Sequence, residues 1–213
     1  MLDLLIGTTN KGKFHEIREV LLELPVQLIT PQEKQITDSP EETGGTYEEN
    51  ARIKSVFYFE TSGGIMTLAE DSGIEIDAFP NELGLKTRRW GAGEHATDEE
   101  WLTYFLEELK KKPKEKHTAR FHCTAALTLQ NGTSRETHVF HGECPGFLHT
   151  EPKTAIPHGI PLSACFQPEG FEKVYAALTP EEKNSISHRG RAIHQVRDFL
   201  KQYLRIPSED QKN

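Results

Sequence analysis

Two adjacent acids, Glu70 and Asp71, are the residues of this sequence best placed to do chemistry. They follow the apolar segment Ile65–Ala69, which predicts a buried strand, and open α/β sheets place ligand sites at the carboxyl ends of strands. Side chains alternate along a strand, so the two carboxylates should face opposite sides. Carboxylate oxygens suit Mg²⁺, and one acid could instead take a proton from a metal-held water. The alternative is an acidic turn in which Asp71 and Gly73 take their usual roles.

A second polar group, Thr8 to Lys13, lies between an apolar run and an amphipathic segment. The run Leu2–Gly7 predicts a buried strand, and apolar residues at helical spacing predict a helix over 14–24. The turn between them would present free backbone N–H groups and the positive end of a helix dipole, which suits an anion. Thr8 and Asn10 would add hydrogen bonds and Lys13 a charge. The spacing is not that of a Walker loop, and the alternative is an ordinary connection.

Glu49 is a third candidate, on a helix predicted over 47–61 with Thr46 as its N-cap. It lies four and seven positions before Ile53 and Val56, on the face that we expect to be buried. A buried carboxylate is costly unless it is paired, hydrogen-bonded or bound to a cation. Glu49 is therefore a candidate metal ligand. The alternative is that it completes a capping box with Thr46.

The fourth group lies near the carboxyl end of the chain, where His188 and Arg189 open the last predicted helix. The helix dipole and their charges would favour a phosphate or a carbonyl oxygen of a nucleobase. Arg189 can hydrogen-bond such a group in bidentate fashion, and Lys183 adds a further cation. The alternative is a solvated basic start of a helix.

Composition restricts the class of protein. The chain has 213 residues, a net charge of −8, 27% charged and 35% hydrophobic residues, as expected of a globular protein. Its three cysteines, Cys123, Cys144 and Cys165, form no Cys-x-x-Cys pair and indicate reduced thiols in a cytoplasm. We find neither a run of transmembrane length nor the start of a signal peptide. The negative net charge argues against a broad nucleic-acid or acidic-membrane surface, so an anionic substrate needs local cations or a metal.

The order of predicted elements favours an α/β fold with a mixed, twisted central sheet and flanking helices. Further strands are predicted over Val26–Thr30, Ile74–Ala78, Ala119–Leu129, Ser134–Phe140 and Gly146–Thr150. A strong hairpin signal lies at Asn131-Gly132. This hairpin and an amphipathic helix over 98–111 would form a second lobe across a cleft from the first. No clean linker separates the lobes, so we predict a single domain over 1–206, with a frayed polar tail over 207–213.

Taken in order, these stretches resemble the inosine triphosphate pyrophosphatase family, hydrolases of noncanonical purine nucleoside triphosphates, over about residues 2–204. Five motifs carry the resemblance: Thr8-x-Asn10-x-x-Lys13 with Glu16, Glu49-Asn50-Ala51-x-x-Lys54, Glu70-Asp71-Ser72-Gly73, a loop keeping Gly84 and Arg89, and Lys183-Asn184 followed by Ser187-His188-Arg189-Gly190.

The resemblance implies a Mg²⁺-dependent house-cleaning pyrophosphohydrolase that converts a nucleoside triphosphate and water to a monophosphate and diphosphate. Asp71 would bind metal and activate water, with Glu70 as a second catalytic candidate and Glu49 as a metal ligand. The substrate-binding residues would be Thr8, Thr9, Asn10, Lys13, Ser72, Arg89, Ile160, Ser163, Lys183, His188 and Arg189. The resemblance also implies a homodimer.

The loop that reads the purine in this family is rewritten here, over 159–166. Ile160 replaces an aromatic residue that stacks on the base, Pro161 a flexible glycine and Ser163 an acid. Ile160 loses the ring-on-base geometry, and Ser163 carries no charge. Two alternatives therefore stay open: the same chemistry on a different or modified nucleotide, and a nucleotide-binding protein without efficient turnover that senses or contacts partners.

Overall fold

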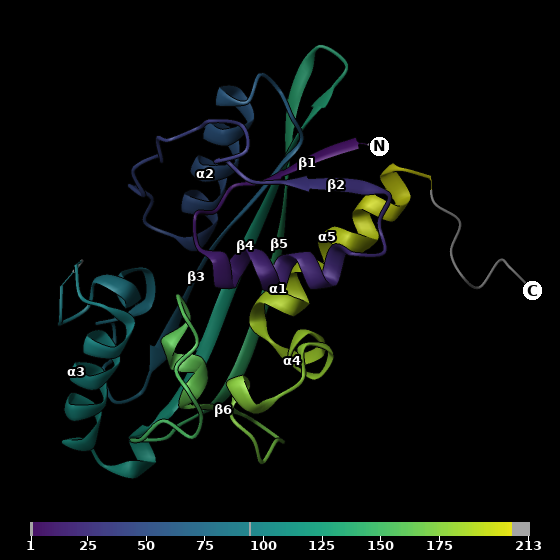
Figure 1. Cartoon of the computed structure of the whole chain (residues 1–213). Coiled ribbons are helices and arrows are strands. Elements are labelled where there is room, and N and C mark those ends of the chain that lie inside the picture. The colour runs from purple at the N-terminus through teal and green to yellow at the C-terminus, as the bar shows by residue number, and fades with distance from the viewer. Residues whose placement is uncertain (1, 94, 206–213) are drawn as a thin grey trace, which may run out of the picture.

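A six-stranded mixed sheet forms the centre of the computed structural model, which describes residues 2–93 and 95–205 (Figure 1). Its strands are β1 (Leu2–Ile6), β2 (Val26–Ile29), β3 (Thr67–Ile76), β4 (Thr118–Asn131), β5 (Ser134–Leu148) and β6 (Phe166–Pro168), in the order β2-β1-β3-β4-β5-β6. β1 pairs in parallel with β2 and β3, and the other pairs are antiparallel. The predicted mixed α/β class is confirmed. The predicted frayed tail lies outside the described residues.

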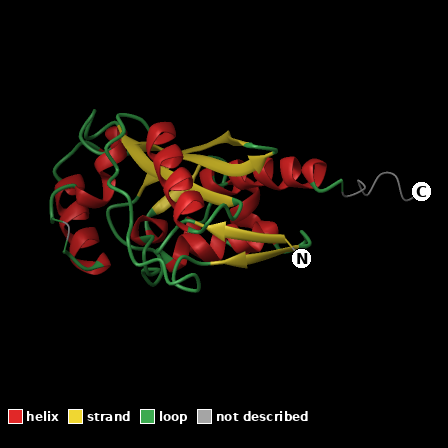
Figure 2. Cartoon of the chain, turned by 90° about the horizontal axis from the view of Figure 1, so that it is seen from above, coloured by secondary structure: helices red, strands yellow, loops and turns green. Residues whose placement is uncertain are grey.

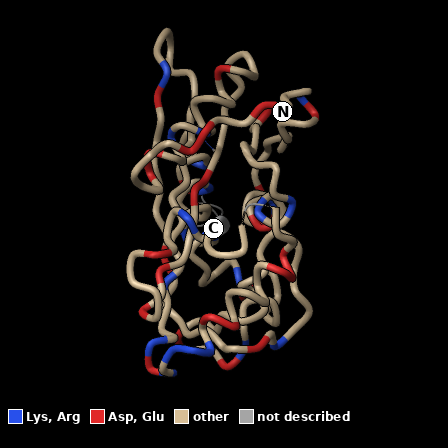
Figure 3. Tube along the Cα trace, turned by 90° about the vertical axis from the view of Figure 1, so that its left-hand side faces the viewer, with Lys and Arg blue, Asp and Glu red and all other residues tan. Residues whose placement is uncertain are grey.

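Helices cover both faces of this sheet (Figures 1 and 2). They are α1 (Lys11–Leu21), α2 (Tyr47–Thr61), α3 (Asp98–Lys110), α4 (Pro180–Ile186) and α5 (His188–Tyr203). On one face α5 packs on β4, β5 and α1, whereas α2 packs on β3 and β4 from the other face. No helix among the described residues is long and apolar enough to span a membrane. In the view of Figure 3, acidic and basic segments are interspersed along the trace.

The buried apolar side chains form two large clusters. One lies between the sheet and helices α1 and α5, and includes Leu4, Ile17, Leu127 and Val196. The other surrounds α3 and the distal parts of β3 to β6, and includes Ile74, Trp101, Phe105, Leu148 and Phe166. β3 and β4 contribute to both clusters, and the division of one domain into two lobes stays a prediction.

The acids at 70 and 71 do not end a strand, contrary to our expectation. Most residues of the two predicted strands, 65–69 and 74–78, lie in the single strand β3 (Thr67–Ile76), which pairs with β4 along its whole length. A side chain at Gly73 would break this strand, since its Cβ would lie 2.2 Å from the carbonyl oxygen of Gly84. The parallel pairing with β1 ends at Leu68, so both acids still follow the carboxyl end of the parallel part of the sheet.

The second half of the hairpin is also longer than predicted. β5 continues from Ser134 to Leu148 as one strand, because β4 pairs with it from Ser134 to Phe147, including Pro145, and β6 pairs with Leu148. The long loop predicted after it contains the short strand β6 and a 3₁₀ turn over Pro161–Ala164.

Candidate functional site

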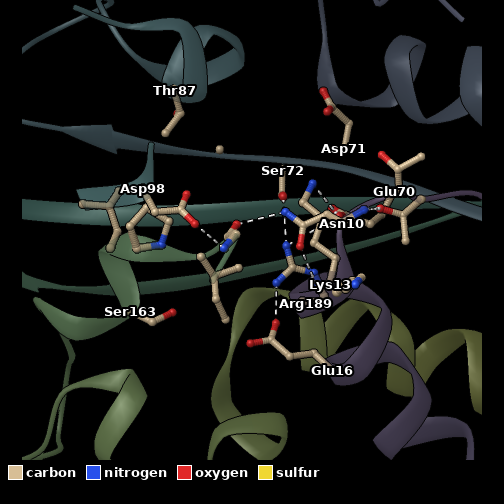
Figure 4. Close-up of a pocket in the computed structure, with 18 of the residues that line it drawn as sticks. Asn10, Lys13, Glu16, Glu70, Asp71, Ser72, Thr87, Asp98, Ser163 and Arg189 are labelled. Atoms are coloured by element: carbon tan, nitrogen blue, oxygen red, sulfur yellow. Dashed lines mark hydrogen bonds and ion pairs between the residues drawn. The ribbon is translucent and has the colours of Figure 1, made fainter. Parts of the chain in front are cut away.

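A large cleft of about 1340 Å³ lies where the β1–α1 turn, β3, the start of α5 and the loop before β6 meet (Figure 4). The cleft brings together every predicted substrate-binding residue whose side chain the structure describes, and both acids of β3. These side chains come from segments up to 181 positions apart, Thr8 and Arg189 being the extremes. The side chain of Arg89 lies outside the described part of the chain, and its backbone ends the 3₁₀ helix Gly84–Arg89.

The strand-to-helix turn is formed as predicted, but its helix begins earlier. Asn10 is the N-cap of α1, since its Oδ1 accepts a hydrogen bond of 3.1 Å from the N–H of Lys13. The hydroxyl of Thr8 accepts a hydrogen bond of 3.2 Å from the N–H of Asn10. With the cap at Asn10, the helix starts at Lys11 instead of position 14, and its N-terminus points its free N–H groups at the cleft end of the turn.

Glu70 lies at the centre of a buried ionic cluster on the α1 and α5 side of β3. One of its oxygens lies 2.7 Å from Nζ of Lys13 and 3.5 Å from Nη2 of Arg189. Arg189 also forms an ion pair with Glu16, which in turn pairs with Lys183. Three cations thus face two carboxylates, so the cluster carries an excess of positive charge. An anion in the cleft would balance it.

Electrostatics hold this cluster ionised. Burial alone would raise the pKa of Glu70, but the charges of Lys13 and Arg189 hold it well below its usual range. The same balance of burial against two cations lowers the pKa of Glu16 to about 2. Nη2 of Arg189 additionally donates to the hydroxyl of Ser72 at 3.1 Å. The guanidinium is therefore held in a fixed orientation beside the cleft.

Burial favours the neutral form of the His188 imidazole. Burial, and then the charge of Arg189, lower its pKa well below the usual value for histidine. Its ring stacks on Phe121, with centroids 4.6 Å apart, and its buried Nδ1 has no hydrogen-bond partner among the described residues. A neutral imidazole with an unpaired nitrogen beside the cleft can form a hydrogen bond with a polar, uncharged group of a ligand. It is less suited to binding a charged group.

Asp71 lies on the opposite side of β3, as alternation predicts (Figure 4). Its two oxygens accept hydrogen bonds from Nζ of Lys54 at 2.9 Å and from Nδ2 of Asn50 at 3.2 Å. Lys54 also lies 3.0 Å from a carboxylate oxygen of Glu42, which lines the cleft. Asp71 and Glu42 are thus two carboxylates that share one ammonium group.

The predicted burial of Glu49 is wrong. Glu49 is exposed at the first turn of α2, and it is not among the described residues that line the cleft. Its side chain accepts a hydrogen bond of 2.6 Å from the N–H of Gly45, and its own N–H donates to the hydroxyl of Thr46. Only the Thr46 half of the expected capping box is formed, and Asn50 is the buried polar residue instead.

The rewritten loop contributes to the cleft mainly through residues 158–163. Ile160 is half-buried, whereas Ser163 is buried and its hydroxyl lies 3.4 Å from Nζ of Lys183. At this distance the hydrogen bond from Lys183 to Ser163 is weak.

Sequence reasoning assigned no separate role to Glu16, Lys54 or Glu42. The first two could have been found, because Glu16 lies four positions before the buried Val20, and Lys54 four positions before the buried Tyr58. A charge at helical spacing on an apolar face indicates a buried ion pair. Glu42 lies in a loop without periodicity, so only the fold places it near Asp71.

Fold and site together define a mixed α/β protein whose cleft suits a phosphorylated ligand. The sequence model of the Ham1 family matches residues 4–199. The dITP/XTP pyrophosphatase of Halalkalibacterium halodurans is 36% identical over 200 residues, covering 94% of this chain and 100% of the relative. That of Streptomyces coelicolor is 35% identical over 206 residues, covering 96% and 100%.

Solved structures agree. A HAM1 protein from Coxiella burnetii superposes with a TM-score of 0.78 at 33% identity, covering 95% of this chain and 100% of the other. The Ham1 protein of Staphylococcus aureus gives 0.75 at 28% identity, covering 94% and 99%. The chain belongs to the Ham1 family, which confirms the resemblance predicted from its motifs.

Replacing Glu16 by glutamine should lower stability in a pH-dependent way. Its pKa is depressed in the folded state, so its ion pairs stabilise the fold above pH 4.5 and lose this effect as pH falls toward about 2. Removing one partner of a buried ion pair costs roughly 3–5 kcal/mol. We therefore expect a loss of a few kcal/mol in the free energy of unfolding at neutral pH, shrinking near pH 3. Urea denaturation at both pH values measures it.

Glu23→Gln is the matched control, since Glu23 also pairs with two cations, Arg197 and Lys201, but at the surface. Exposed pairs contribute about 0–1 kcal/mol. Equal losses in the two variants would show that the burial of Glu16 has no energetic consequence.

Proposed function

We propose that this protein is a Mg²⁺-dependent nucleoside triphosphate pyrophosphohydrolase that removes noncanonical purine nucleotides such as dITP, ITP and XTP. The observation that carries the proposal is the cleft itself, in which an excess of buried positive charge lies across β3 from Asp71. Its relatives named dITP/XTP pyrophosphatase support the substrate class. We further propose a cytoplasmic homodimer.

The arrangement of charge suggests how a triphosphate would lie. The phosphates would be bound by Lys13 and Arg189 and by the N–H groups at the start of α1. Lys183 and the neutral imidazole of His188 border the side nearer the rewritten loop, where they suit the oxygen of an oxidised purine. An amino group at that position of the base would meet the ammonium donor of Lys183 instead of an acceptor.

Asp71 is the proposed general base. The oxygen of water bonds to the α phosphorus, the bond from that phosphorus to the bridging oxygen breaks, diphosphate leaves, and Asp71 takes the proton that water loses. Lys54 and Asn50 hold both carboxylate oxygens in place. Lys13 and Arg189 would stabilise the negative charge that develops on the leaving diphosphate. Glu70 remains ion-paired with these two cations, so we assign it the role of orienting them.

The donor set fits magnesium. Among the described residues there is no group of three or more His, Cys, Asp or Glu side chains arranged to hold a metal. Mg²⁺ is usually bound by one or two carboxylates together with waters and substrate phosphates. Asp71 and Glu42 would supply these carboxylates on the same side of the cleft. When bound, the ion would neutralise phosphate charge and lower the pKa of a coordinated water.

Two other functions remain as alternatives because Ile160 and Ser163 replace the family's base-reading groups. The first keeps the chemistry but admits a different or modified base. The second is a nucleotide-binding protein with weak turnover. The paired groups around Asp71 favour turnover, since a sensor has no need of an oriented base.

Pyrophosphate release with Mg²⁺ from ITP, dITP, XTP, the standard triphosphates and modified ones tests this proposal. We expect selective release from ITP, dITP and XTP. We also expect Asp71→Asn to lower the rate by about 10²–10⁴-fold, the usual contribution of a general base. Glu75→Gln is its control, because Glu75 lies on the same face of β3 but is exposed. Release from another base alone would support the first alternative, and binding without release from any triphosphate the second.

The second metal ligand can be identified by comparing Glu42→Gln with Glu49→Gln. We expect Glu42→Gln to raise the Mg²⁺ concentration for half-maximal rate at least about tenfold, as loss of metal-site groups usually does. Glu49→Gln should change it less than about twofold, because Glu49 is exposed and bound to Gly45. A larger effect of Glu49→Gln would instead support the ligand predicted from the sequence. Magnesium titration by calorimetry gives a readout independent of turnover.

A further inference from the structure

The two ends of the cleft differ in chemistry. The ion pairs around Glu70 lie at one end, whereas the other end, here called the neutral end, is lined mainly by uncharged side chains, among them Leu85, Trp101, Ile156 and Ile160, together with the acids Asp98 and Glu99 of α3. A flat heterocycle with few charges fits the neutral end, and a triphosphate fits the charged one. The loop before β6 supplies part of the neutral end, so its position determines the shape that a nucleobase meets.

This loop is held from two sides at Gly159. Its N–H donates to Oδ2 of Asp98 at 2.7 Å, and its carbonyl oxygen accepts from Nδ2 of Asn10 at 2.9 Å (Figure 4). Gly159 has a φ of +77°, and a Cβ there would lie 2.6 Å from the side chain of Asn10. The loop backbone is therefore pressed against the phosphate-binding turn, in a conformation that favours glycine.

Asp98 reaches this loop from the other lobe. It is the first residue of α3, whose Trp101 and Phe105 are buried in the core around that helix. The side chain of Asp98 is 14% exposed and also lies 3.1 Å from Nδ1 of His158. A hydrogen bond from a backbone N–H to a carboxylate is charge-assisted and is among the stronger ones in proteins. The bond to Gly159 thus ties α3 to the loop at the neutral end of the cleft.

We propose that Asp98 is a positioning residue that fixes residues 158–160 and thereby sets the discrimination among nucleobases. This inference rests on the proposed function. With Ile160 and Ser163 in place of an aromatic ring and an acid, the side chains of this loop supply little selective contact beyond that of Lys183 and His188. A fixed loop backbone excludes ill-fitting bases by shape, because a rigid pocket cannot adapt to them at low cost.

Asp98→Ala and Asp98→Asn test the proposal. In Asp98→Ala the acceptor is lost, so hydrogen exchange at the amides of Gly159 and Ile160 should accelerate at least about tenfold. The KM for ITP should rise about tenfold with kcat changed less than about threefold, and the preference for ITP over GTP in kcat/KM should fall at least about fivefold. Asp98→Asn keeps an acceptor oxygen and should restore most of the preference. Glu107→Ala, an exposed site on the same helix, controls for changes in α3.

The outcomes separate this inference from the proposed function. Exchange does not need turnover, so unchanged exchange in Asp98→Ala overturns the positioning role whether or not the protein is active. Faster exchange with an unchanged preference for ITP over GTP overturns the role in discrimination. Failure of the wild-type protein to release pyrophosphate from any triphosphate overturns the proposed function, and the discrimination role with it.

Discussion

The ion pairs of Glu70 with Lys13 and Arg189 hold together the three segments that make the site. Glu70 belongs to β3, a central strand of the sheet, Lys13 to the first helix and Arg189 to the last. Taking these charges out of water is costly, and a buried pair stabilises a fold only where geometry and further hydrogen bonds compensate. Here Glu16 and Ser72 supply that compensation to Arg189. The desolvation cost of these buried charges therefore falls at the cleft.

A buried cluster with more cations than carboxylates is poorly balanced as a purely structural device. A protein selected for stability alone would do as well with apolar side chains of similar volume at these positions. The excess charge makes sense once an anion binds, because the phosphates then complete the balance that Glu16 and Glu70 begin. The same carboxylates keep the cations oriented, so little reorganisation is needed when the ligand arrives.

Local patterns predicted much of this site, because strand, turn and helix signals depend on neighbouring residues. The turn at Thr8 to Lys13, the two faces of Glu70 and Asp71, and the helix opened by His188 follow from apolar spacing and alternation. The length of β3 did not follow, since Gly73 is typical of a turn in sequence but pairs with His122 of β4, and Gly84 packs against it where a Cβ would not fit. For Glu49 the spacing to Ile53 and Val56 was misleading, because Glu49 lies in the first turn of α2, where its side chain is exposed and binds the N–H of Gly45 in the preceding loop.

Contacts between segments far apart in the sequence could not be predicted from local patterns. Nothing near position 98 indicates that its carboxylate meets a backbone amide 61 residues further along the chain. Asn10 shows why such contacts matter: its Oδ1 caps α1 at the phosphate end, while its Nδ2 binds the carbonyl of Gly159 at the neutral end. A shift of the first helix toward a bound phosphate therefore moves the same amide group that holds the loop. Through the Asn10 side chain, binding of the phosphates and binding of the base would therefore be coupled, although the two parts of the nucleotide contact different elements of the fold.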